Sequence, residues 1–173
     1  MSGIDIFNVI NIRRAELSDF DFFYKIKSEY SNVYWTGHSK FPKYDELRKW
    51  YEYTLFSNPA REILIIQYNN ENVGYIYLDK IKKDTLEIAM AICEKYQSKG
   101  VGAIALKKLL KYIFQRFNNS SIEAWIFESN IESIRLFSKN GFIAANETRI
   151  VDFPLKNSKE KQIKFIFAGD SNG

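Results

Sequence analysis

The sequence of 173 residues contains one cysteine, Cys93, and one histidine, His38. A single cysteine excludes an internal disulfide, and these two residue types are too scarce for a zinc site built on them. Long hydrophobic runs are also missing, since no apolar stretch approaches the roughly 18 residues of a membrane span. The first residues lack a basic region followed by an apolar run, so we expect no signal peptide. The expected setting is cytoplasmic, with no metal and no membrane partner.

Positive charge is only slightly in excess, since the formal net charge is +4 and the pI is near 9.0. Basic and aromatic residues are not interleaved in one stripe, so we do not expect a nucleic-acid partner. Phosphorylated small molecules suit this mild basicity. The length fits a single domain over residues 1–173, with enough chain for a real core. Repeats, low-complexity segments and linkers are all missing from the sequence.

Hydrophobic periodicity predicts an element order of β α α β β β α β α β β. The predicted strands cover 6–14, 61–68, 72–80, 85–93, 121–128, 142–153 and 161–169. The predicted helices cover 18–30, 44–56, 100–117 and 130–139, with 31–42 as a loop. Short connections favour an antiparallel meander in the middle of the chain, and a parallel βαβ crossover follows it. The fold class is therefore mixed α+β, with a mostly antiparallel sheet and flanking helices.

Two glycines, Gly100 and Gly102, stand where the polar loop 97–102 turns into the helix 100–117. Glycine costs helix stability, so this placement indicates close approach of a ligand, and helix N-termini attract phosphate. The P-loop string is not present in the sequence. Residues 100–105, GVGAIA, match the dinucleotide string. However, the preceding strand belongs to a meander rather than a parallel βαβ unit, and no strand-end acidic residue follows at the required distance.

A third interpretation fits both the string and its context. Residues 97–102, QSKGVG, resemble the Q/R-x-x-G-x-G/A motif of the Gcn5-related N-acetyltransferase (GNAT) family. Residues 128–142, ESNIESIRLFSKNGF, resemble a second segment of that family. The matching positions there are Asn130, Ser133, Leu136, Lys139, Gly141 and Phe142. The element order matches over essentially the whole chain, and the two motifs are far more specific together than the loop alone.

The resemblance implies the acyl-CoA acyltransferase fold and acetyl-CoA as cosubstrate, lying between strands 85–93 and 121–128. Loop amides at the helix start would hold the pyrophosphate. Backbone groups near the end of the first strand would pair with the pantetheine arm, and an N–H there would polarise the thioester carbonyl. The expected CoA-binding residues are Ala91, Ile92, Gln97, Ser98, Lys99, Gly100, Val101, Gly102, Ala103 and Asn130.

Two positions depart from the family pattern. The family often has glycine where this chain has Ser98, and tyrosine where it has Phe137. That tyrosine commonly protonates the departing thiolate. Phe137 cannot, so the general acid must be another group or water. A thiolate whose conjugate acid has a pKa of about 8.5 can also leave without full protonation.

An amine acceptor must lose a proton before it attacks, and the resemblance implies a carboxylate base on the central strand. Leu86, Ile88, Met90 and Ile92 alternate there with Glu87, Ala89, Ala91 and Cys93. Glu87 lies among small residues that leave room for a substrate, so it is the candidate base. The plainer alternative for Glu87 is an exposed strand charge or a salt bridge. His38 is a lesser candidate as proton carrier, and Cys93 is most simply a small apolar residue.

The acceptor would be set by the segment before the second strand, which holds YWTGHSKF at 34–41. This loop resembles two branches of the family. One is the sugar-nucleotide amine N-acetyltransferases of nonulosonic acid biosynthesis, and the other is the ribosomal-protein and aminoglycoside acetyltransferases. Mild basicity favours an anionic, phosphate-bearing acceptor. Trp35, Thr36 and Tyr75 are the expected substrate-binding residues of this small-molecule amine site.

Other classes of function stay open. A non-catalytic CoA-binding module of the same fold would explain Phe137, and a dinucleotide-binding protein would explain the glycine string. The sequence does not determine the oligomeric state, and a homodimer is compatible with it.

Overall fold

A single mixed sheet organises the protein in the computed structural model, which describes residues 5–36, 40–118 and 120–169. The described residues form seven strands in the order β1-β2-β3-β4-β5-β7-β6. The strands are β1 Ile10–Arg14, β2 Arg61–Tyr68, β3 Glu71–Lys82, β4 Thr85–Ile92, β5 Ser121–Phe127, β6 Phe142–Phe153 and β7 Ser158–Phe167. Neighbouring strands run antiparallel except β4 and β5, which are parallel. The predicted α+β class, with its meander and single parallel crossover, is confirmed.

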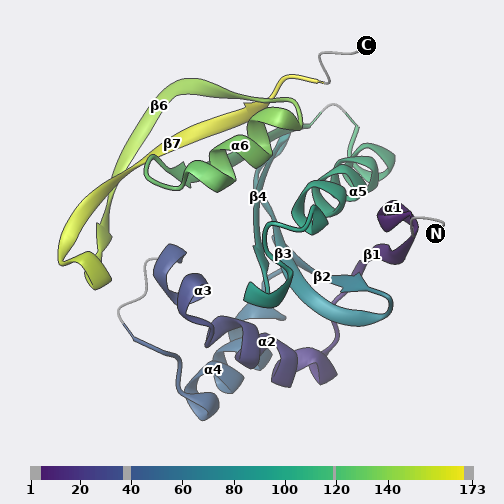
Figure 1. Cartoon of the computed structure of the whole chain (residues 1–173), viewed down its shortest axis with the longest axis vertical. Helices are drawn as coiled ribbons and strands as arrows, with labels where there is room; N and C mark the ends of the chain where they lie inside the picture. Colours follow the sequence, from purple (N-terminus) through teal and green to yellow (C-terminus); the bar gives the residue numbers. More distant parts are fainter. Residues whose placement is uncertain (1–4, 37–39, 119, 170–173) are drawn as a thin grey trace.

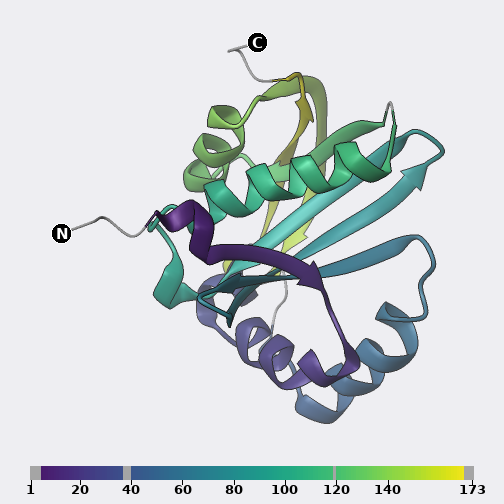
Figure 2. The ribbon, with the colours of Figure 1, turned by 90° about the vertical axis from the view of Figure 1, so that its right-hand side faces the viewer.

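Helices cover both faces of this sheet. The α-helices are α1 Ile6–Val9, α2 Phe20–Lys27, α3 Tyr30–Trp35, α4 Tyr44–Trp50, α5 Val101–Arg116 and α6 Ile131–Lys139, and the π-helical turn η2 Tyr51–Leu55 follows α4. Short 3-10 turns occupy Leu17–Asp19 (η1), Glu94–Tyr96 (η3) and Pro154–Lys156 (η4). Figure 1 shows α5 on one side of the central strands and α2, α3 and α4 on the other, and Figure 2 shows α5 lying along the sheet.

Each face of the sheet has its own apolar core. The larger core packs α5 and α6 on the sheet through residues such as Leu109, Ile113 and Phe137. The smaller core packs α2 and η2 on the other face through Phe23 and Tyr51. Strand β4 contributes to both, because Leu86 and Ile88 belong to the first core and Ala91 packs against the second, to which Cys93, the residue after β4, also belongs. The predicted period-2 alternation of β4 therefore sets which side chains face which layer.

Several predicted boundaries are wrong, and those near the N-terminus differ most in kind. The first strand begins at Ile10, because Asp5 caps a helical turn by accepting a hydrogen bond from the Phe7 N–H at 3.1 Å. The predicted helix 18–30 ends at Lys27, and α3 follows inside the predicted loop 31–42. Tertiary contacts hold α3, since the Ser31 N–H donates to Glu94 Oε1 at 2.8 Å and Tyr34 packs edge-on against Phe153. A local pattern does not report such contacts.

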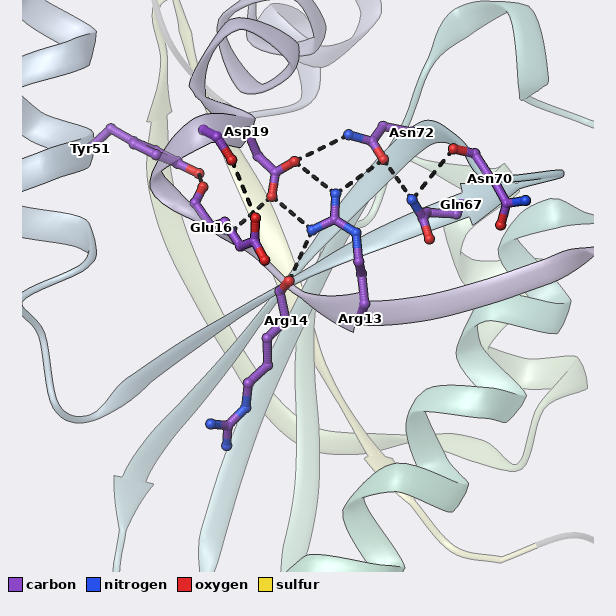
Figure 3. Close-up of polar contacts among 9 residues, drawn as sticks. Arg13, Arg14, Glu16, Asp19, Tyr51, Gln67, Asn70 and Asn72 are labelled. Carbon is purple, nitrogen blue, oxygen red and sulfur yellow. Dashed lines mark hydrogen bonds and ion pairs between the residues drawn. The ribbon is translucent and has the colours of Figure 1, made fainter.

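A partly buried ion pair connects β1 to the 3-10 turn η1 before α2 (Figure 3). The Arg13 guanidinium donates to both carboxylate oxygens of Asp19, at 2.7 and 2.8 Å. Asn72 on β3 accepts from Arg13 and donates to Asp19, both at 3.3 Å. The Tyr51 hydroxyl donates to the Glu16 carbonyl at 2.8 Å, which links η2 to the same turn. Hydrogen bonding from Arg13 lowers the pKa of Asp19 below its usual value.

Candidate active site

The two parallel strands pair over a short length and then separate. In the described part of the chain, the register of β4 and β5 joins Thr85 to Ser121, Leu86 to Ile122 and Glu87 to Glu123, and ends there. Beyond this point β4 pairs with β3, and β5 pairs with β7. A cleft of about 410 Å³ opens where the two strands part. The separation therefore creates a site in the middle of the sheet.

Many of the predicted site residues meet in this cleft. Its wall includes Glu87 and Ala91 of β4, Asn130 before α6, and the three predicted substrate-binding residues Trp35, Thr36 and Tyr75. Ile92 and the glycine-loop residues, 97–103, are not among the residues that line the cavity. Ile92 is the last residue of β4, and the glycine loop follows β4 after Cys93 and η3. His38 lies outside the described residues.

The direction of the β4 backbone decides which amides face the cleft. The Cys93 N–H donates to the Val73 carbonyl on β3, and the Ser121 N–H of β5 donates to the Asp84 carbonyl, both at 2.8 Å. Because backbone groups alternate along a strand, Met90 and Ile92 point theirs away from β3. Ala91 points its own backbone groups toward β3, so of the two predicted residues, Ala91 and Ile92, only Ile92 has its backbone groups on the side of β4 away from β3, as its neighbour Met90 does. The alternation in the sequence predicts the face of the sheet on which each side chain lies, but not the neighbouring strand toward which each backbone amide points.

The glycine loop has the geometry of an anion cradle. Gly100 adopts φ +80°, a left-handed conformation that glycine reaches without strain, and it immediately precedes α5. A Cβ at Gly100 would meet no atom of the described residues within 4 Å, so the space above it is open. The first amides of α5, from Val101, Gly102 and Ala103, precede any helical acceptor and meet the positive end of the helix dipole. The loop therefore fits a pyrophosphate.

The second glycine, Gly102, has a packing role in addition to the predicted one. A Cβ at Gly102 would lie 3.3 Å from Leu136 Cδ2 on α6, which is tighter than ordinary contact. The small residue at 102 therefore lets α5 and α6 approach closely. Because Leu136 belongs to the second sequence motif, this contact joins the two motifs in space.

Two predicted CoA-binding side chains make contacts that shape the site. Gln97 Nε2 donates to the Ile92 carbonyl at 2.9 Å and to Ser31 Oγ at 3.0 Å, so it ties the loop to β4 and α3. Asn130 Oδ1 accepts from the Ser133 N–H at 3.2 Å and caps α6. Ser98 and Lys99 are exposed in the loop, and Ser98 has φ +57°.

Glu87 stands in the middle of a row of charges across the sheet. Its register partners are Asp79 on β3 and Glu123 on β5. Arg61 holds Asp79 with two contacts of 2.6 Å, and Lys164 lies 3.5 Å from Glu123. Within the described residues, neither cation comes within 4.0 Å of Glu87. Asp79 and Glu123 thus each have a cation within 4.0 Å, whereas Glu87, between them, has none among the described residues.

This arrangement changes the proton affinity of Glu87. Burial raises its pKa above the usual value, and the neighbouring charges of Asp79 and Glu123 add to that rise. Arg149 and Arg61 act in the opposite direction but do not cancel it. A carboxylate with a raised pKa is a better proton acceptor near neutral pH.

Phe137, which stands where the family often has tyrosine, is packed against other apolar side chains. Phe137 is 4% exposed and lies edge-on to Phe142, with ring centroids 5.0 Å apart. It lines the cleft without a hydroxyl. A different phenol, Tyr77, also lines the cleft, and its hydroxyl has no hydrogen-bond partner among the described residues. Burial raises the pKa of Tyr77 well above its usual value, so it keeps its proton.

The cleft contains residues that the sequence pattern did not single out. All three tryptophans of the chain, Trp35, Trp50 and Trp125, line it. Three cations, Lys27, Arg61 and Arg149, line it beside a single carboxylate, Glu87. A signal existed for Trp125, because Glu123, Trp125 and Phe127 alternate with Ile122, Ala124 and Ile126 on β5. Lys27 and Arg149 come from distant segments that only the tertiary fold brings together.

Other kinds of site find little support in the part of the chain that the structure describes. A second cavity of about 330 Å³ opens beside the start of β2, and none of the predicted site residues lines it. The described residues contain no cluster of three His, Cys, Asp or Glu side chains that could hold a metal. Among them there is also no helix of the length and apolarity needed to cross a membrane.

The fold and the open strand pair define an acyl-CoA acyltransferase architecture. The model of the acetyltransferase (GNAT) family matches residues 21–142, and the chain belongs to this family. A crystal structure of spermidine N-acetyltransferase from Vibrio cholerae in complex with CoA and spermine shares the fold, with a TM-score of 0.81 and 17% identity. That comparison covers 92% of this chain and 95% of the other. A structure of AAC(6')-Ib with ribostamycin and coenzyme A gives a TM-score of 0.74 at 17% identity, covering 91% and 92%.

Two curated acetyltransferases match part of the chain. Spermine/spermidine N(1)-acetyltransferase of Bacillus subtilis is 34% identical over 80 residues, which is 46% of this chain and 47% of the relative. Acetyltransferase PseH of Campylobacter jejuni is 22% identical over 95 residues, or 55% and 59%. The chain thus spans about half the length of the curated relatives it matches. The family and these named relatives are acetyltransferases.

Proposed function

We propose that the protein transfers the acetyl group of acetyl-CoA directly to a primary amine of a small-molecule acceptor, with Glu87 as general base. One observation carries this proposal: Glu87 has no cation partner among the described residues and lies where β4 and β5 part, inside the cleft. The family relationship supplies the reaction class.

Each group in the cleft has a defined part in this reaction. Acetyl-CoA supplies the activated acyl group, and the amides at the start of α5 fit its pyrophosphate. The Met90 N–H, on the side of β4 that faces away from β3, would stabilise negative charge on the thioester oxygen. Glu87 would take a proton from the ammonium of the acceptor, directly or through one water, and leave a neutral amine that can attack. As nitrogen bonds to the acyl carbon, the carbon–sulfur bond breaks, and a second proton of the nitrogen passes, directly or through water, to the departing thiolate.

The charge and aromatic content of the cleft favour an amino-sugar nucleotide as acceptor. Three cations and one carboxylate line the cleft, so its charge complements an anion and opposes a polycation. Tryptophan faces suit sugar rings and nucleobases, which stack on aromatic side chains.

A polyamine, an aminoglycoside or a ribosomal-protein amine is the second candidate acceptor. It is favoured by the relative of 34% identity, whose name gives spermine and spermidine. The cations of the cleft argue against it. A non-catalytic CoA-binding module is the remaining alternative, because Phe137 replaces the usual acid.

The test is a thiol-release assay with acetyl-CoA and three acceptors: a UDP-linked amino sugar with a free amine, spermidine and an aminoglycoside. We expect turnover with the sugar nucleotide. Turnover with spermidine alone would establish the second candidate. If acetyl-CoA raises the melting temperature but no amine is acetylated, the module interpretation replaces the enzyme. A melting-temperature shift with NAD rather than CoA would contradict the loop assignment itself.

A further inference from the structure

Lys27, the last residue of α2, is a buried cation at the wall of the cleft. It is 9% exposed, and its ammonium nitrogen lies 5.4, 5.3 and 5.4 Å from the ring centroids of Phe23, Tyr75 and Tyr77. Lysine is among the residues least often buried, because removing its charge from water is costly unless a partner compensates. The three rings stabilise the ammonium through their π faces but do not neutralise it.

The partner that a buried ammonium needs is missing from the described residues. No carboxylate oxygen among them lies within 4.0 Å of Lys27 Nζ. Of the other two cations of the cleft, Arg61 forms its ion pair with Asp79 at 2.6 Å. Arg149 has no ion pair among the described residues, but it is exposed to water; it donates to Gln162 at 2.6 Å, and its guanidinium lies 4.4 Å from the Trp125 ring. Lys27 is therefore the buried cation of this wall that lacks a compensating charge among the described residues.

We propose that Lys27 binds a phosphate oxygen of the acceptor and so sets the preference of the cleft for phosphorylated amines. This inference rests on the proposed function and adds to it the residue that anchors the acceptor. An ammonium on a flexible stem suits a phosphate group as a point charge. The cosubstrate's own pyrophosphate fits at a different place, the loop 97–102, which does not line the cleft.

Register relationships place this anchor beside the proposed reaction centre. Tyr75 and Tyr77, which surround Lys27, pair with Ala91 and Ala89 of β4. Glu87 lies two residues before Ala89 on the same face. A bound acceptor with its amine at Glu87 and its phosphate at Lys27 would therefore lie across small alanine side chains, which leave it room.

A purely structural role for Lys27 makes the opposite predictions. If the ammonium served only to pack the rings, Lys27→Met would lower the melting temperature and leave anion binding unchanged. If Lys27 serves a ligand, the variant removes an uncompensated buried charge. Its melting temperature without ligand should then stay equal or rise, while anion affinity falls.

The experiment titrates inorganic pyrophosphate into the full chain with saturating CoA present, so that the glycine loop is occupied. Tryptophan fluorescence is the readout, because all three tryptophans line the cleft. We expect Lys27→Met to weaken pyrophosphate binding at least about tenfold, and Lys27→Arg to retain part of the affinity. Lys25→Met, an exposed lysine of the same helix, is the matched control and should bind as the wild type does.

Three outcomes would overturn the inference: equal pyrophosphate affinity in wild type and Lys27→Met, no binding to the wild type, or binding that CoA abolishes. The last result would assign the anion site to the cosubstrate. The melting-temperature shift caused by acetyl-CoA should be the same in all variants. If acetyl-CoA does not shift the melting temperature of the wild type, the proposed function is contradicted. If acetyl-CoA shifts it but pyrophosphate does not bind, only the role of Lys27 is contradicted.

Discussion

Glu87 and Glu123 are register partners at the last point where β4 and β5 pair in the described residues, and the sheet opens immediately beyond them. Two carboxylates side by side raise each other's proton affinity unless a cation intervenes. Lys164 Nζ lies 3.5 Å from Glu123 Oε2 and forms an ion pair with it. Burial raises the pKa of Glu87 at this point, and the charges of Asp79 and Glu123 add to the rise.

The base assignment predicts a large loss of activity for Glu87→Gln. The amide keeps the shape of the side chain but accepts no proton, so kcat should fall roughly 100-fold or more. The Kd for acetyl-CoA should be nearly unchanged, because the glycine loop is separate. Steady-state kinetics and a thermal-shift titration measure the two quantities. Glu46→Gln, on an exposed helix surface, is the control, and full activity of Glu87→Gln at pH 7 would rule out Glu87 as base.

Glu87→Gln, which should lower activity, should leave the stability of the fold equal or higher. Because the folded state raises the pKa of Glu87, folding disfavours its charged form. This cost is absent below the unfolded pKa of about 4.3 and is fully present once the pH exceeds the folded pKa. Glu87→Gln should therefore unfold at an equal or higher urea concentration at pH 7. A clear destabilisation would indicate that Glu87 has a structural role.

The flanking carboxylate Asp79 should tune the pH dependence of the reaction. Asp79→Asn removes a negative charge that raises the pKa of Glu87 and releases Arg61 from its ion pair. Both effects lower the pKa of Glu87, so the acidic limb of the kcat/KM profile should move to lower pH, by roughly half a unit or more. A pH–rate profile of the variant measures this. An unchanged limb, or one at higher pH, would show that Asp79 does not influence the base.

Gly100 should be essential for CoA binding. Gly100→Ala places a side chain in a left-handed conformation, at a cost of roughly 1–2 kcal/mol, and puts a methyl group where the pyrophosphate would approach. We expect a weaker Kd for CoA by calorimetry as well as a lower stability. Gly169→Ala is a close control, because Gly169 has φ +95° and equally open space around its Cβ but lies far along the chain from the loop. Equal CoA affinity in the two variants would contradict the assignment.

Acid unfolding should report the ion pair between Arg13 and Asp19. Because the pKa of Asp19 is lowered in the folded state, its stabilisation is present above the unfolded pKa of about 3.9 and is lost as the pH falls through the folded pKa. Asp19→Asn should destabilise the protein by about 2 kcal/mol at pH 7, less than a fully buried pair would because the Arg13 side chain is 34% exposed. Urea unfolding at pH 7 and at pH 3 measures this. The loss should shrink at the lower pH, and an equal loss at both would contradict it.

Local patterns predicted much of the fold because most elements carry their own signal. The alternation of β4 placed Glu87, Ala89 and Ala91 on the face opposite Leu86, and all three line the cleft. Helix α3 was missed because its order depends on contacts with Glu94 and Phe153, which are far away in the sequence. Lys27 was missed for a similar reason. Its burial and its three aromatic neighbours arise when α2 packs on β3, and no spacing within α2 indicates them.

The contact between Gly102 and Leu136 has an evolutionary consequence. The family motif accepts glycine or alanine at position 102, and here a methyl group would come within 3.3 Å of the leucine. The residues at positions 102 and 136 therefore share one space between α5 and α6, and a larger residue at one position needs a smaller residue at the other. Among relatives, alanine at the first position should accompany a smaller residue at the second, so the two motifs should covary.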